Sequence, residues 1–128
     1  MPTLSSFRRH SADHFEPQND LDPTSQRRLR GHLEQIDFTG FACNREVIGA
    51  ALRQADAKKF QRLALACANA RALWISEAIA MADSSPAGLD PRQTARLTDL
   101  RTAYDELTEA YEGLRRMVDR GYLAYQAT

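Results

Sequence analysis

The feature that most restricts the fold is a regular apolar stripe between residues 97 and 118. Its members recur at alternating spacings of three and four residues: Leu97, Leu100, Tyr104, Leu107, Tyr111, Leu114 and Val118. This spacing places every one of these side chains on the same face of an α-helix. Ala103, Ala110 and Met117 widen the stripe, which is typical of a helix in a bundle core. We therefore expect one long helix from Pro91 to about Tyr125.

A second long helical segment precedes this one, because residues 45–82 contain no proline and only one glycine, Gly49. One face carries Ile48, Leu52, Phe60, Leu63, Cys67, Ala70, Trp74, Ala78 and Met81. Nearly opposite lies a second apolar stripe, made of Leu65, Ala72, Ile75 and Ile79. A helix that is apolar on two sides must be covered on both. Asp56 falls on the first face, so we predict a kink or a break between Gln54 and Ala57.

The segment that joins the two helices, residues 83–90, contains serine, proline and glycine close together, and this composition indicates a turn. Because the connection is short, the helices should form an antiparallel hairpin. A turn centred near Pro86 places Trp74 opposite Leu100 and Phe60 opposite Leu114.

The pattern Leu-Asp-Pro, four residues, Arg-Leu occurs twice, as LDPTSQRRL from Leu21 and as LDPRQTARL from Leu89. An aspartate accepts hydrogen bonds from free amides of a first helical turn, and proline is suited to the first helical position. In the second copy, Gln93 adds the residue needed for a capping box. We interpret the repeat as a device that starts helices and not as a duplicated functional site.

The first copy predicts a short helix over residues 23–37, with an apolar stripe of Leu29, Leu33 and Ile36. Thr39 and Gly40 should end it, and Asn44 should cap the next helix. This first helix is too short to cover the second stripe of the hairpin, so a second copy, another protein or residues 1–20 must cover the remainder.

These expectations define an all-α fold: a short N-terminal helix followed by a long antiparallel helical hairpin, within a three- or four-helix bundle. We expect residues 1–20 to be a mobile polar tail and residues 21–128 to form a single helical domain. Dimerisation into a four-helix core is the favoured arrangement. The alternative is a monomeric bundle in which the second helix folds back at Asp56.

Catalytic and metal-binding patterns are missing from the sequence. Neither Cys43 nor Cys67 has a neighbouring histidine, and there is no G-x-S-x-G motif or glycine-rich phosphate loop. His10 and His14 are four residues apart, but they fall in the expected tail and are not predicted to bind a native metal. We therefore predict no enzyme activity, no cofactor and no metal site.

The overall charge is also uninformative, since 17 basic residues balance 17 acidic ones. A net charge of zero gives no general attraction to nucleic acid or to an anionic membrane. No apolar run approaches the roughly 20 residues of a membrane span. Two cysteines without a paired pattern are typical of a reducing compartment, so we expect a cytoplasmic protein without a membrane partner.

By elimination, the sequence favours a non-catalytic protein-binding module, acting as an adaptor, a small chaperone or a regulatory partner, and as a homodimer. The residues expected to bind the protein partner or second copy are Leu65, Ile75, Ile79, Tyr122 and Tyr125. Apolar helix faces and tyrosines are both common in protein interfaces.

The alternative function is a DNA-binding regulator with a helix-turn-helix-like segment at residues 44–63, whose turn would lie at 54–57. Lys58, Lys59 and Arg62 would contact phosphates. The turn contains no glycine, and its second helix continues into an apolar run that needs burial, so nucleic acid is the less favoured partner.

Overall fold

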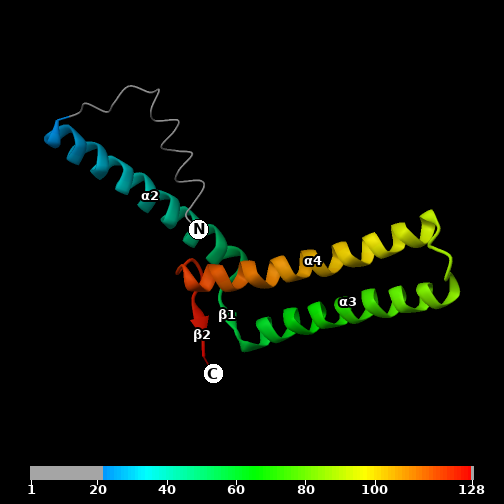
Figure 1. Cartoon of the computed structure of the whole chain (residues 1–128). Helices are drawn as coiled ribbons and strands as arrows, with labels where there is room; N and C mark the ends of the chain where they lie inside the picture. Colours follow the sequence, from blue (N-terminus) through cyan, green and yellow to red (C-terminus); the bar gives the residue numbers. More distant parts are fainter. Residues whose placement is uncertain (1–21, 128) are drawn as a thin grey trace. The chain divides into compact units, whose positions relative to one another are not determined.

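The computed structural model describes residues 22–127, and it confirms the all-α prediction (Figure 1). In chain order the elements are α2 (Pro23–Leu52), β1 (Ala55–Asp56), α3 (Ala57–Ser84), α4 (Pro91–Asp119) and β2 (Tyr125–Gln126). The chain divides into two compact units, the first ending at Thr39 and the second covering Gly40–Thr128. The expected tail, with His10 and His14, lies outside the described residues.

The antiparallel hairpin is formed by α3 and α4, which lie side by side (Figure 1). Phe60 packs against the cluster that contains Leu114, and its ring lies 5.5 Å from that of Tyr111, one helical turn from the predicted Leu114. Towards the turn, the Trp74 ring stacks on Tyr104, with ring centroids 6.0 Å apart, one helical turn from the predicted Leu100. The hairpin therefore has the predicted direction and nearly the predicted register.

Three helices begin at an aspartate, as their sequences indicate. The backbone amide of Ser25 donates to the Asp22 carboxylate at 2.7 Å, and that of Lys59 donates to Asp56 at 2.9 Å. Asp90 and Gln93 form the full capping box, with both hydrogen bonds present. The repeated Leu-Asp-Pro pattern is thus a helix start in both copies, and the predicted break near Asp56 is confirmed.

The prediction of a short first helix ending near residue 37 is wrong, because α2 continues through Gly40 to Leu52. Asn44 is therefore inside α2, where its amide donates to the Gly40 carbonyl, and it does not cap a new helix. A glycine within a helix costs only about 1 kcal/mol. Tertiary contacts on the following turns offset that cost: Phe41 packs on Tyr122, and Arg45 donates to the Gly121 carbonyl at 2.8 Å.

The prediction that the last helix reaches Tyr125 is also wrong, because α4 ends at Asp119. Gly121 has a φ of +80°, the left-handed conformation that terminates many helices. The Gly121 amide donates to the Val118 carbonyl and the Tyr122 amide to the Met117 carbonyl, which together make a Schellman motif. The chain then turns back, and β2 pairs in parallel with β1. Strands of two residues carry no detectable sequence pattern, and none was predicted from the sequence.

The core lies where the last turns of α2, the start of α3 and the segment after α4 meet. Ala55, Leu114 and Leu123 form its buried cluster, and the partly buried side chains of Ile48 and Phe60 pack against them. Within residues 22–127, Leu100 is the one further hydrophobic residue that is buried. The hairpin beyond this end is therefore only two helices thick, and much apolar surface remains in contact with solvent.

Candidate protein interface

The outer face of α3 carries the largest exposed apolar side chains of the hairpin that share one side. Leu65 is 63% exposed, Ile75 44% and Ile79 59%. On a helix of 3.6 residues per turn these positions point in similar directions. Phe60 and Trp74, which contact α4, lie on a different side of the helix. Three of the five predicted partner-binding residues are thus brought together on one open face.

The remaining surface of the hairpin is different in character, since α4 has no large hydrophobic residue that is exposed. Its apolar stripe faces α3, and Leu100 and Leu114 within it are buried. Charged side chains occupy its outer side, including the ion pair between Arg116 and Glu109 at 4.0 Å. The apolar surface of the hairpin is therefore concentrated on α3.

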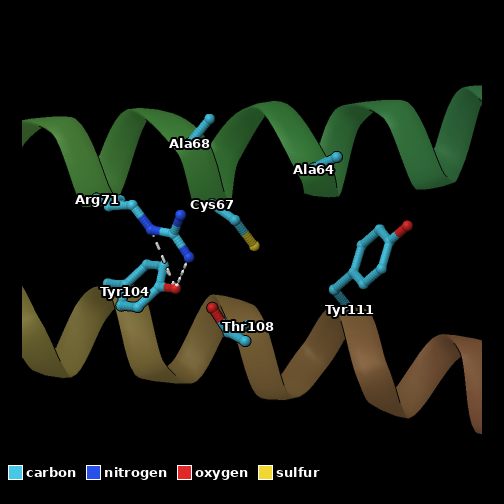
Figure 2. A pocket seen from close by; sticks show the side chains of 7 residues that line it. All are labelled: Ala64, Cys67, Ala68, Arg71, Tyr104, Thr108 and Tyr111. Carbon is cyan, nitrogen blue, oxygen red and sulfur yellow. Dashed lines mark hydrogen bonds between the residues drawn. The ribbon is translucent and has the colours of Figure 1, made fainter.

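Beside this face runs an open groove of about 270 Å³ between the two helices (Figure 2). At one end of the groove, Arg71 reaches across to Tyr104: Nε donates to the phenol oxygen at 3.2 Å, and Nη2 donates to the same oxygen. The guanidinium carbon is also 5.0 Å from the centre of the Tyr104 ring. These hydrogen bonds lower the pKa of Tyr104 below its ordinary value, because they stabilise the phenolate.

Other groups around this groove are apolar or small. Cys67 points towards α4, whereas Ala68 lies at the outer edge of the groove, next to the exposed face (Figure 2). The Thr108 hydroxyl is buried beside the Tyr104 phenol, and after Arg71 it is the next group that lowers the pKa of Tyr104. The Arg71–Tyr104 contact was not predicted from the sequence. The contact could have been predicted from the position of Arg71, because this arginine lies on the face of α3 that the hairpin directs towards α4.

A second groove, of about 530 Å³, opens elsewhere on the hairpin. Leu63, Leu114 and Leu123 line it, and Lys59 and Arg62 contribute its basic side chains. Because it borders the buried cluster, it is a continuation of the small core and has no polar set suited to chemistry.

The two predicted tyrosines lie elsewhere and contact aromatic rings of their own unit. Tyr122 packs on Phe41, with ring centroids 5.5 Å apart, and Tyr125 approaches Phe60 at 6.3 Å. Tyr125 is still half exposed, in β2. A role for this pair in partner binding stays a prediction, separate from the face on α3.

The three residues of the nucleic-acid hypothesis are not equally available. Lys58 and Arg62 are exposed. Lys59, however, donates through Nζ to the Leu52 carbonyl at 3.0 Å and to the Gln54 carbonyl. The Lys59 ammonium therefore satisfies free carbonyls at the end of α2, which disfavours a phosphate contact at that position.

No group of three or more potential metal ligands occurs within residues 22–127, and Cys43 and Cys67 are free thiols. Among the same residues, α3 is long and apolar enough to cross a membrane by length and composition alone. Core helices of soluble proteins meet the same criterion, but they are mostly buried, whereas α3 contains no buried residue in this structure. Comparison of the chain with protein-family models, curated proteins and solved structures gave no match.

Proposed function

We propose that this chain is a non-catalytic protein-binding module, and that the outer face of α3 is its binding surface. One observation carries the proposal: Leu65, Ile75 and Ile79 lie on a single side of α3, and nothing in the second unit covers them. A contiguous exposed apolar patch on a soluble protein is typical of an interaction site. The module acts as an adaptor, a small chaperone or a regulatory partner, and does so as a cytoplasmic homodimer.

The small size of the core supports this proposal. A helical hairpin with so few buried side chains has little apolar burial to offset the conformational entropy lost on folding. Covering Leu65, Ile75 and Ile79 would contribute on the order of 1 kcal/mol each, because each is about half exposed. Completion of a three- or four-helix bundle by a second copy or a partner helix supplies that burial.

The charged groups of α3 favour a protein as the partner over lipid. Arg71 and Glu77 lie inside the apolar stretch, bound to Tyr104 and Arg96 of α4. Each charge would cost roughly 2.5–3.5 kcal/mol at the centre of a membrane-spanning helix. A protein helix laid along the outer face leaves both charges where they are.

The test places a charge on the face. Ile79→Asp should reduce the mass of the protein in sedimentation equilibrium or abolish capture of its partner, because a carboxylate cannot be buried in an apolar interface without a counter-charge. Ala80→Asp is the matched control, since it adds the same charge one residue away on a different side of α3. Equal mass and equal capture for the wild type and both variants would refute the proposal.

A further inference from the structure

We infer that the occupant of this face is the α3 helix of a second copy, packed antiparallel about a two-fold axis that passes between Ala72 and Ile75. The inference rests on the proposed function and specifies its partner. It follows from a heptad pattern on the outer side of α3, from the sizes of the side chains in it, and from two charges at its ends.

The outer face continues beyond its large residues as an unbroken stripe. Its members, at alternating spacings of three and four, are Leu65, Ala68, Ala72, Ile75, Ile79 and Ala82. All six are exposed in the described structure. This is the spacing of a coiled-coil contact, in which side chains of one helix fit between those of the other. It extends for about 27 Å along the helix at 1.5 Å per residue.

Antiparallel pairing makes this stripe complementary to itself. Leu65 then lies level with Ala82 of the second copy, Ala68 with Ile79, and Ala72 with Ile75. Each layer therefore combines one large side chain with one alanine. Such layers fill space evenly and allow the two helices to approach closely.

A parallel pair would lack this complementarity. It would place Ala68 against Ala68 and Ile79 against Ile79, so that voids and crowded layers alternate. Both faults are unfavourable, because an unfilled layer loses contacts and an overfilled one forces strained side chains. The pattern of sizes therefore selects the antiparallel orientation.

Charge complementarity at the ends of the stripe selects the same register. In an antiparallel coiled coil, the positions that directly follow the second contact residue of each heptad flank the interface and lie near their equivalents on the second copy. This places Arg62 close to Asp83, offset by about 3 Å along the axis. The two-fold axis repeats the pair at the other end. Arg62 and Asp83 are both exposed, and neither forms an ion pair within residues 22–127.

The experiment is a charge exchange, measured on the full chain by sedimentation equilibrium. Arg62→Asp and Asp83→Arg should each weaken the dimer roughly tenfold or more, because each brings like charges together twice in one interface. The double variant restores both pairs in reversed order and should recover the wild-type dissociation constant. Because both residues are exposed, circular dichroism should show unchanged helix content in all three proteins.

The orientation has a separate test. A spin label on Ser84→Cys, in a chain whose Cys43 and Cys67 are replaced by serine and alanine, should report a backbone separation of about 30 Å along the axis in the antiparallel pair. A parallel pair would bring the two labels side by side, and that result would overturn the inference.

The outcomes separate this inference from the proposed function. Single variants without effect, or a double variant that fails to recover, would overturn the register and leave the binding face intact. A monomeric wild type that captures another protein through Ile79 would overturn the second copy as occupant. If Ile79→Asp changes neither mass nor capture, both proposals fail.

Discussion

At the scale of single residues, the most informative contact is the one between Arg71 and Tyr104. Arg71 is exposed and keeps access to water, yet its guanidinium is directed at the neighbouring helix. The phenol oxygen of Tyr104 accepts its hydrogen bonds, and the Trp74 ring stacks on the Tyr104 ring. The pair therefore adds a directed polar contact between α3 and α4, beside the Arg96–Glu77 ion pair that joins the same two helices.

Arg71→Gln should raise the pKa of Tyr104 towards its ordinary value of about 10, because the cationic donors that favour the phenolate are removed. Ultraviolet absorbance titration measures this change, with Tyr104→Phe identifying which transition belongs to the residue. Arg101→Gln, an exposed change on α4, is the control and should leave the transition in place. An unchanged Tyr104 titration in Arg71→Gln would contradict the assignment.

The sign of the associated stability change follows from the lowered pKa. Folded protein releases the Tyr104 proton at a lower pH than the unfolded chain does, so this ionisation favours the folded state. Its contribution is fully present above the unfolded pKa of about 10 and is lost as the pH falls through the lower folded pKa. Wild-type protein should therefore gain stability relative to Arg71→Gln as the pH rises through that interval.

At the scale of elements, the helix starts were predictable and two of the helix ends were not. An N-cap is a local event: Asp22, Asp56 and Asp90 each need only an amide three residues ahead. The end of α2 depends on distant partners. Gly40 resembles a stop in the sequence, but Phe41 and Arg45 gain contacts with Tyr122 and Gly121 only if the helix continues.

The candidate face was predictable for a related reason. Leu65, Ile75 and Ile79 belong to a helical period that is visible in the sequence, and their exposure follows once the other face of α3 is committed to α4. Tyr122 and Tyr125 lie beyond the end of α4, in a segment without a period. Their contacts with Phe41 and Phe60 depend on the chain reversal at Gly121, which residue types alone did not reveal.

Gly121→Ala should lower the free energy of unfolding by about 1–2 kcal/mol, because a side chain in the left-handed conformation is strained. Space is not the cause, since an added Cβ would meet the Phe41 ring at an ordinary 3.8 Å. Gly113→Ala is the matched control: it lies inside α4 with no atom within 4 Å, and should stabilise the helix by up to about 1 kcal/mol. Urea unfolding of both variants should show changes of opposite sign, and a common sign would contradict the helix-ending role of Gly121.

At the scale of the second unit, the fold has a buried cluster at one end, called here the closed end, and an exposed apolar face along α3. The closed end gathers the last turns of α2, the start of α3 and the segment after α4, with Ala55 donating to the Ala124 carbonyl at 2.8 Å. Away from it, α3 and α4 have only each other. The buried residues of the second unit gather mainly at the closed end, whereas the outer face of α3 stays exposed.

Leu123→Ala tests whether the closed end stabilises the single chain. Leu123 is 3% exposed and belongs to the buried cluster, so its truncation should cost about 2–4 kcal/mol of unfolding free energy. Leu89→Ala, the same change at a half-exposed position in the turn, should cost less than about 1 kcal/mol. Hydrogen exchange should also quicken at the Ala55 amide, because the β1–β2 pair depends on Leu123 holding the returning chain in place. If the two variants were equally stable and Ala55 stayed protected, the small core would not be what holds the unit together, and covering the outer face of α3 would have to supply that stability.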